Sequence, residues 1–284
     1  MKFRATYAGA AAAALSLGLG LTACGGSSGS GGSSKEAVCK LPDKGPTVKV
    51  GVKFDQPGLG LKDGDKYTGF DVDIARCVAG ELGYSKVDFV QSPSPQREKM
   101  LQAGTVKMIV ATYSITDKRL KEVGFAGPYF VAGQSLLVSK DSKIDSVKGL
   151  AGKKVCSVTG STSVDNLKKE QPNLVPQKYD TYSACAEALA SGSIDAMTTD
   201  DTILAGYANQ SQYKDKFKLV GGTFSEENYG IGLKKGAADC QKVADAIKKT
   251  VDNGNWQKAL DNNLGSDYKY NSESNPPKTP TCQA

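Results

Sequence analysis

The cysteines are the side chains most suited to chemistry in this sequence, because the chain has seven of them and no histidine. None belongs to a Cys-x-x-Cys pair, and without imidazole ligands the pattern argues against a zinc site, so we expect no metal and no cofactor. Setting Cys24 aside leaves six of the seven, an even number that is typical of disulfides in an exported protein. We expect bonds between chain neighbours, with free buried thiols as the alternative. The expected pairs are Cys39–Cys77, Cys156–Cys185 and Cys240–Cys282.

Cys24 stands apart because it follows a segment with the layout of a secretory signal. Two basic residues precede an apolar or small run that ends in Leu21-Thr22-Ala23-Cys24. This ending resembles the bacterial lipobox, whose cysteine is diacylated after cleavage. Residues 25–34 are glycine and serine only, which is typical of a flexible tether. We expect a signal peptide over 1–23, a lipid on Cys24 and a tether over 24–38; an ordinary signal peptide with a chance cysteine is the alternative.

The rest of the chain has the length and composition of an exported globular protein. After the signal, about 260 residues are enough for one large domain or two ordinary ones. The formal net charge is +6, and charges of both signs are mixed along the chain rather than gathered in a basic stripe. We therefore expect no nucleic-acid partner. We also expect a monomer. No later stretch is long and apolar enough to cross a bilayer.

Alternating strand and helix patterns position the remaining polar residues. The expected strands are 47–54, 87–90, 106–111, 134–139, 153–158, 196–198 and 229–233. The expected helices are 70–82, 97–102, 163–170, 184–190 and 237–251. This alternation favours parallel βαβ units, and the Gly127-Pro128 turn divides it into two sets. Segment 56–66 is expected to be a loop, and the polar, proline-rich tail after Ser266 is expected to contribute little core.

Several polar residues lie where these elements begin or end. Lys53 ends the first strand, at the edge where a parallel sheet directs side chains into a ligand crevice. Ser94 and Arg97 lie at the start of the following short helix. Gly160-Ser161-Thr162 precedes another helix, whose free N–H groups can bind a carboxylate. The alternatives from the residues alone are that Lys53 is an exposed strand end and that Arg119 is a solvated side chain on a capped surface helix.

Five segments in chain order resemble the amino-acid solute-binding proteins of ABC importers. They are Gly69-Phe70-Asp71-Val72-Asp73-Ile74, Ile115-Thr116-Asp117-Lys118-Arg119, 125–133 (FAGPYFVAG), 150–155 (LAGKKV) and 191–200 (SGSIDAMTTD). The resemblance implies an α/β fold of the two-lobed periplasmic-binding-protein type (type II). Each lobe would be a mixed, mainly parallel sheet flanked by helices, with two hinge strands and a cleft between the lobes. Lobe 1 would comprise 39–131 and the returning 230–284 with its polar tail, and lobe 2 would comprise 132–229.

The resemblance also implies a role for each polar residue that matches a family contact. The residues expected at the α-carboxylate of a bound amino acid are Arg119, Ser114 and Thr162, and those expected at the α-ammonium are Asp200, Thr112 and Ser114. A guanidinium fork suits bidentate recognition of a carboxylate. For Asp200, a solvated loop acid and a shift of one position to Asp201 are the alternatives.

Lys53, Ser94 and Arg97 match the positions that surround the distal carboxylate in glutamate and aspartate members of the family. Two cations there would disfavour a basic ligand. We therefore expect a receptor, not an enzyme, that binds L-glutamate or L-aspartate and delivers it to an ABC permease from the lipid-anchored outer face of the cell membrane. The alternatives are a receptor for glutamine or another polar amino acid, a sensor or adhesin lipoprotein, and an enzyme resembling cyclohexadienyl dehydratase.

Overall fold

The computed structural model describes residues 37–265 and 268–284. The expected signal peptide (1–23), the expected lipid site at Cys24 and nearly all of the expected tether over 24–38 lie outside the described residues. Val38, at the end of the expected tether, is buried. In the described part of the chain, every helix is too short or too polar to cross a membrane.

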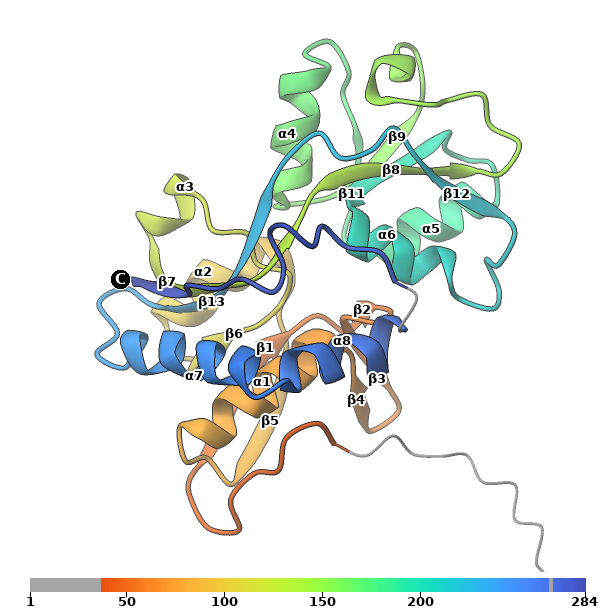
Figure 1. Ribbon diagram of the computed structural model, residues 1–284. Coiled ribbons are helices and arrows are strands. Elements are labelled where there is room, and N and C mark those ends of the chain that lie inside the picture. Colours follow the sequence, from red (N-terminus) through yellow and green to blue (C-terminus); the bar gives the residue numbers. More distant parts are fainter. Residues whose placement is uncertain (1–36, 266–267) are drawn as a thin grey trace, which may run out of the picture. The chain divides into compact units, whose positions relative to one another are not determined.

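The first of two large sheets has six strands in the order β14-β7-β13-β6-β1-β5, and with its helices it forms lobe 1 (Figure 1). The strands are β1 (Thr47–Val52), β5 (Lys86–Gln91), β6 (Met108–Ile109), β7 (Val123–Ala132), β13 (Glu227–Lys234) and β14 (Thr281–Gln283). Strand β1 pairs in parallel with β5 and β6, whereas β13 pairs antiparallel with β6 and β7. The parallel strands therefore end at one edge of this sheet, as the βαβ pattern predicts.

The second large sheet has five strands in the order β10-β9-β11-β8-β12 and is the centre of lobe 2. The strands are β8 (Gln134–Ser139), β9 (Val155–Val158), β10 (Gln177–Tyr179), β11 (Ala196–Asp200) and β12 (Phe217–Val220). Strand β9 is parallel to β10 and β11, and β8 is antiparallel to β11 and β12. The expected α/β class is confirmed. Each sheet contains about as many antiparallel as parallel strand pairs, rather than mainly parallel ones, because β8 and β13 pair antiparallel with their neighbours.

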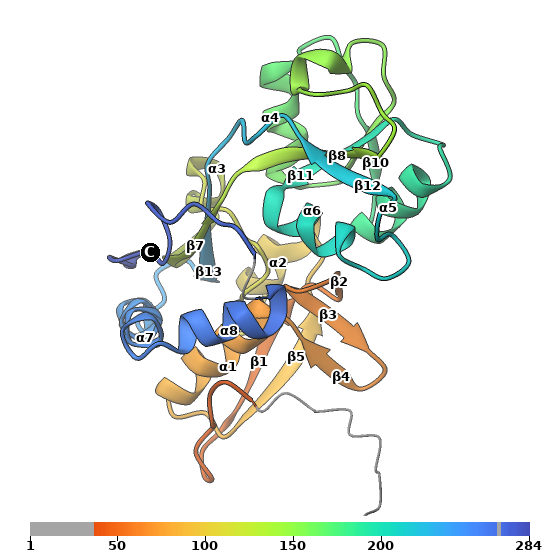
Figure 2. The same ribbon diagram turned by 45° about the vertical axis from the view of Figure 1, so that its right-hand side comes forward.

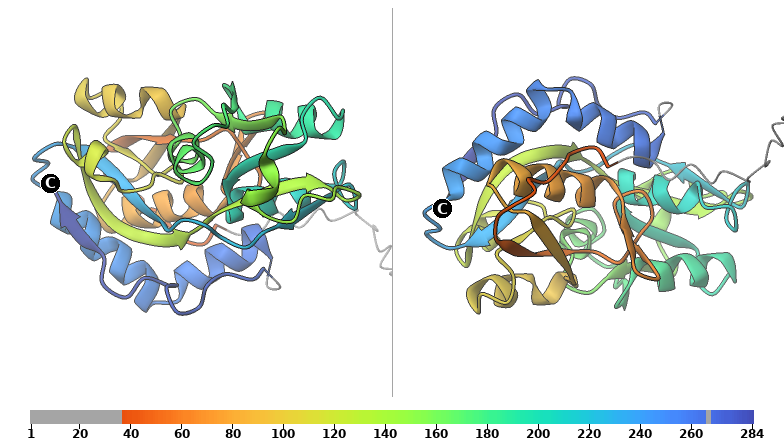
Figure 3. Two further views of the ribbon diagram at one scale, coloured as in Figure 1. Left: turned by 90° about the horizontal axis from the view of Figure 1, so that it is seen from above. Right: turned by 90° about the horizontal axis from the view of Figure 1, so that it is seen from below.

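Helices cover both faces of the lobe 1 sheet. Lobe 1 has α1 (Phe70–Glu81), α2 (Arg97–Gln102), α3 (Asp117–Leu120), α7 (Cys240–Asp252) and α8 (Asn255–Leu264), and lobe 2 has α4 (Thr162–Glu170), α5 (Tyr182–Ala190) and α6 (Asp201–Ala208). Figure 3 shows α7 and α8 on one side of the sheet and α2 and α3 on the other. Trp256 of α8 stacks on Phe130 and donates its indole N–H to the Tyr129 carbonyl, 2.7 Å away. This aromatic contact joins the helical layer to strand β7.

The chain crosses between the lobes twice, and the two crossing segments lie side by side (Figure 2). Strand β7 passes through Gly133 into β8, and the chain returns through residues 221–226 into β13, which pairs with β7. A Cβ atom on Gly133 would lie 2.5 Å from the Thr223 Cβ, so the absence of a side chain lets the crossings approach each other. The two crossings are thus placed together like the two strands of a hinge.

The three expected disulfides, Cys39–Cys77, Cys156–Cys185 and Cys240–Cys282, are confirmed. The expectation for segment 56–66 is wrong. Segment 56–66 contributes to a small three-stranded sheet rather than a loop, with strands β2 (Asp55–Gln56), β3 (Gly60–Asp63) and β4 (Lys66–Thr68). As expected, the described tail adds little hydrophobic core. It is nevertheless attached to lobe 1, because the Asn275 side-chain amide accepts a hydrogen bond from the Val131 N–H at 2.9 Å and donates one to the Val131 C=O at 2.8 Å.

Candidate functional site

A small cavity lies where the two lobes meet. Its lining residues are Ser94, Arg97, Thr112 and Arg119 from lobe 1, and Ser161, Thr162, Ser163, Tyr182, Asp200 and Ile203 from lobe 2. All the expected ligand-contacting residues are among them except Lys53 and Ser114. The lining residues Ser163, Tyr182 and Ile203 were not predicted from the sequence. The structure therefore brings most of the expected polar groups together at a single inter-lobe site.

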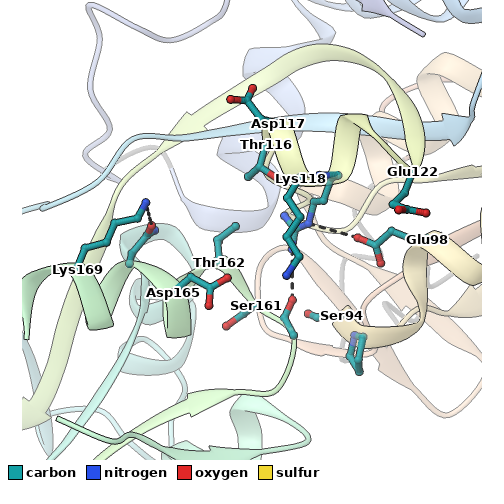
Figure 4. Close-up of a pocket in the computed structure, with 14 residues that line it drawn as sticks. Ser94, Glu98, Thr116, Asp117, Lys118, Glu122, Ser161, Thr162, Asp165 and Lys169 are labelled. Atoms are coloured by element: carbon teal, nitrogen blue, oxygen red, sulfur yellow. Dashed lines mark hydrogen bonds and ion pairs between the residues drawn. The ribbon is translucent and has the colours of Figure 1, made fainter. Parts of the chain in front are cut away.

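A larger pocket shares Ser94, Arg119, Ser161 and Thr162 with this cavity. Figure 4 shows its two walls, with Ser94, Glu98 and Glu122 on one side and Thr162, Asp165 and Lys169 on the other. Because both signs of charge line it, this pocket does not by itself favour a cation or an anion.

Arg119 is fixed by contacts with both lobes. Its Nη1 donates to the Ser114 carbonyl at 2.7 Å, and its Nη2 donates across the lobes to the Gly160 carbonyl at 3.4 Å. Its Nε lies 3.5 Å from a carboxylate oxygen of Glu98. Arg119 is only 8% exposed, so the alternative of a solvated arginine is wrong. A guanidinium held in this way is pre-oriented for a planar anion.

Arg97 is a second buried guanidinium, and no acid among the described residues forms a direct ion pair with it. Its Nε donates to the Ser92 carbonyl at 3.3 Å, and its Cζ lies 5.0 Å from the centre of the Tyr113 ring. Within residues 37–265 and 268–284, no carboxylate oxygen comes within 4.0 Å of a nitrogen of this side chain. Burial, and then the nearby Arg119 charge, lowers the pKa of Arg97. The site therefore holds a desolvated positive charge that a ligand anion would stabilise.

Tyr113 is a residue whose role the sequence did not indicate. Its ring also lies 4.7 Å from the Arg119 Cζ, so a single aromatic ring contacts both guanidinium groups. Its hydroxyl donates to Glu98 at 2.8 Å. Tyr113 therefore contacts both arginines and orients the acid that pairs with Arg119.

Lys53 does not line the cavity, although it is nearly fully buried. Its Nζ lies 3.2 Å from an oxygen of Asp55 and 5.7 Å from the centre of the Tyr182 ring. Burial above all lowers the pKa of Lys53. The alternative of an exposed strand end is wrong, but the charge of Lys53 is already paired within the protein, and Tyr182 lines the cavity instead.

The carboxylates of Asp200 and Asp201 have different hydrogen-bond partners. Asp200 lines the cavity, and its Oδ2 accepts a hydrogen bond from the Tyr229 hydroxyl at 2.6 Å. Its Oδ1 is buried and has no hydrogen-bond partner among the described residues. Asp201 instead accepts hydrogen bonds from the backbone N–H groups of Gly133 and Thr202, near the hinge. Since Asp200 is 4% exposed, the alternative of a solvated acid is wrong.

Glu227 is a buried acid that sequence reasoning missed. It lies at the start of β13, where it accepts hydrogen bonds from the Thr162 hydroxyl at 3.0 Å and the Asn166 amide at 2.6 Å. The Thr162 hydroxyl is also 3.5 Å from that of Ser114. Burial, and then the Glu227 charge, raises the pKa of Asp200 well above its ordinary value. Glu227 thus connects the hinge strand to the first residue of α4.

Asp71 belongs to the segment 69–74, the first of the five that resemble the solute-binding family, and its carboxylate fixes the backbone at Thr112. Thr112 has a φ of 45°, a conformation that is uncommon for residues other than glycine. Its N–H donates to the Asp71 carboxylate at 2.9 Å, and the Tyr129 hydroxyl donates to the same carboxylate at 2.8 Å. Burial raises the pKa of Asp71 to about 6. This buried acid positions the segment that carries Thr112 and Ser114.

Comparisons with known proteins agree with this geometry. The chain is 42% identical over 273 residues to the glutamate-binding protein GluB of Corynebacterium glutamicum, covering 90% of this chain and 89% of that one. It is 40% identical over 246 residues to the ABC transporter glutamine-binding protein GlnH of Bacillus subtilis, covering 82% and 88%. A solved structure of an ancestral arginine-binding protein bound to glutamine has a TM-score of 0.72 and 34% identity, covering 78% of this chain and 100% of that one.

A solved structure of the GluR0 ligand-binding core from Nostoc punctiforme in complex with L-glutamate has a TM-score of 0.69 and 25% identity, covering 77% of this chain and 99% of that one. These two structural neighbours confirm the expected two-lobed, type II periplasmic-binding-protein fold. The bacterial extracellular solute-binding proteins, family 3, match residues 48–266. The chain therefore belongs to this family of extracellular solute-binding proteins.

Proposed function

We propose that this protein is the amino-acid receptor of an ABC importer and that it binds L-glutamate or L-aspartate between its lobes. The observation that carries the choice of an acidic ligand is the buried Arg97 guanidinium, which lines the cavity without an acid partner in the described chain. A charge held out of water without a partner is unfavourable, and a ligand carboxylate would offset that cost. A neutral side-chain amide would offset less of it.

The remaining polar groups suit the two ends that all amino acids share. Arg119 and the start of α4 at Thr162 are placed to bind the α-carboxylate. The unpartnered Asp200 Oδ1 is suited to the α-ammonium. Because these groups come from both lobes, a ligand between them would bind the closed form better than an open one. The closed form would then be the one that the permease recognises.

Glutamine is the second candidate, and one observation favours it. Asp55 neutralises Lys53, so one of the two cations expected at the ligand side chain is already paired. Relatives of this chain are named for both ligands, GluB for glutamate and GlnH for glutamine. The specificity therefore depends on Arg97.

Replacing Arg97 with glutamine tests this assignment. Losing one partner of a buried charge pair costs about 2–5 kcal/mol, so we expect Arg97→Gln to weaken glutamate binding by roughly 30-fold or more and glutamine binding far less. Calorimetric titration of the wild type and the variant with both ligands measures the change. Arg76→Gln is the matched control, because Arg76 is on the partly exposed face of α1 and pairs with Asp73. An unchanged preference in Arg97→Gln would assign the ligand side chain to another group.

We also propose that a lipid on Cys24 holds the protein at the outer face of the cell membrane. The Leu21-Thr22-Ala23-Cys24 sequence and the glycine and serine run after it support this anchor. Two acyl chains suffice for stable attachment, so wild-type protein should sediment with membranes and Cys24→Ser protein should not. Mass spectrometry of the mature N-terminus provides the control. Equal fractionation of the two proteins, with an unmodified Cys24, would contradict the anchor. A tether of this kind would raise the receptor concentration near its permease.

We propose binding without turnover, because the relatives are solute-binding proteins rather than enzymes. A sensor or adhesin would use the same site, and uptake of labelled glutamate by cells with and without the receptor separates these roles from transport.

A further inference from the structure

A turn of lobe 1 contacts two helices of lobe 2 beside the ligand cavity. The turn comprises residues 55–58, which begin in β2. The Asp55 carboxylate accepts a hydrogen bond from the backbone N–H of Tyr182 at 2.9 Å, and the Asp55 carbonyl accepts one from the Tyr207 hydroxyl. Tyr182 is the first residue of α5, and Tyr207 belongs to α6. These contacts join the lobes without using any group that we assign to the ligand's α-carboxylate or α-ammonium.

Gly206 of α6 provides the closest approach between this turn and lobe 2. A Cβ atom at position 206 would lie 2.1 Å from the Pro57 carbonyl oxygen, far inside any real contact. Gly206 is in the helix and does not have a positive φ, so its own backbone would accept alanine. Glycine in a helix is less favourable than alanine by about 1 kcal/mol. Glycine is therefore required at position 206 because the Pro57 carbonyl of lobe 1 lies so close, and not because of the conformation of α6.

The contact also positions a cavity residue. Tyr182 lines the cavity, and its ring faces Lys53, which pairs with the same Asp55 carboxylate. A carboxylate at the N-terminus of α5 is favourable because the helix dipole is positive there. As the first residue of its helix, Tyr182 has no carbonyl of α5 to accept its N–H. Asp55 is thus the group that satisfies this N–H when the lobes are together.

We propose that residues 55–58, together with Tyr182, Gly206 and Tyr207, form a lobe latch that raises ligand affinity by favouring closure of the lobes. The latch rests on the proposed function, because it matters only if the lobes close on a ligand. Its contacts favour the closed form, and their strength adds to the affinity of any ligand that requires closure. Asp55 and Gly206 are accordingly positioning residues.

Gly206→Ala tests the latch because its added methyl group obstructs only the closed form. We expect roughly 10- to 100-fold weaker glutamate binding, the range that overpacking of a tight contact produces. The unfolding temperature of the ligand-free variant should stay close to that of the wild type, because the helix preference of alanine offsets the lost latch contacts and the open form remains accessible. Gly149→Ala is the control in the same lobe, since a Cβ there would be 3.8 Å from its nearest heavy atom. Tyr207→Phe removes one hydroxyl and should weaken binding by roughly 3- to 10-fold.

Amide hydrogen exchange at Tyr182, followed by NMR without ligand, separates the latch from the proposed function. In Gly206→Ala this N–H should exchange faster than in the wild type, because Asp55 can no longer reach it, and Gly149→Ala should match the wild type. Equal exchange in Gly206→Ala and the wild type would overturn the latch, whichever amino acid binds. If the wild type binds no acidic amino acid, the proposed ligand is wrong. The exchange rates at Tyr182 would still show whether the latch contact forms.

Discussion

Arg119→Ala is expected to abolish binding of every amino acid, whatever its side chain. The guanidinium is buried, and it is oriented by the Ser114 and Gly160 carbonyls and by Glu98. Because all amino acids share the α-carboxylate, removing its partner should affect glutamate, aspartate and glutamine alike. Breaking a buried ion pair costs about 3–5 kcal/mol, which corresponds to more than about 100-fold in affinity. Calorimetric titration with each amino acid measures the loss.

Two control variants separate this role from a loss of folding. Arg119→Lys keeps the charge but not the planar fork, so it should recover part of the affinity at most. Arg76→Ala removes a partly exposed arginine from the same lobe and should leave binding unchanged. If Arg119→Ala is folded and still binds any amino acid with wild-type affinity, the α-carboxylate site has been assigned to the wrong residue.

Asp200→Asn should lose most of the affinity and, with it, the pH dependence of binding. Burial, followed by the charge of Glu227, raises the pKa of Asp200 well above its ordinary value. A ligand ammonium favours the ionised carboxylate, so binding below that raised pKa must release a proton. Wild-type affinity should therefore be complete above the raised pKa and should decline as the pH falls through it. Asparagine cannot ionise, so the variant should show weak binding with no such decline.

The neighbouring acid provides the control for this experiment. Asp201 accepts backbone hydrogen bonds from Gly133 and Thr202 and does not line the cavity. Asp201→Asn should change the stability of the hinge region more than the ligand affinity. If Asp201→Asn loses the pH-dependent binding and Asp200→Asn keeps it, the roles of the two acids are reversed.

Sequence patterns predicted the elements that depend on local spacing. Helix α2 has the predicted bounds, Arg97–Gln102, because its polar and apolar residues already follow a helical period. The disulfide pairs were also predictable, since each joins cysteines that are neighbours along the chain. Three features could not be predicted, because each depends on partners that are distant in the sequence. They are the pairing of the hinge strands β7 and β13, the contact of Asn275 with Val131, and the small sheet within residues 55–68.

The same limit applies to the candidate site. The residue types at Arg97, Arg119 and Asp200 were sufficient to propose them, and the structure places all three at one cavity. Lys53 pairs with Asp55, which is only two positions away in the sequence. The orientation of Asp55, however, depends on its hydrogen bond with Tyr182, which is 127 positions from it. Nothing in the sequence indicated that Glu227 is buried, because a glutamate at the start of a strand is commonly exposed. Its burial depends on the contact of β13 with α4.

The most direct test of the central claim is calorimetric titration of the wild-type protein with L-glutamate, L-aspartate, L-glutamine and L-arginine under one set of conditions. A buried Arg97 without an acid partner predicts that one of the two acidic amino acids binds tightest, that glutamine binds more weakly, and that arginine binds weakest. Tightest binding of glutamine would mean that the protein itself compensates the Arg97 charge. Tightest binding of arginine would contradict the charge argument altogether.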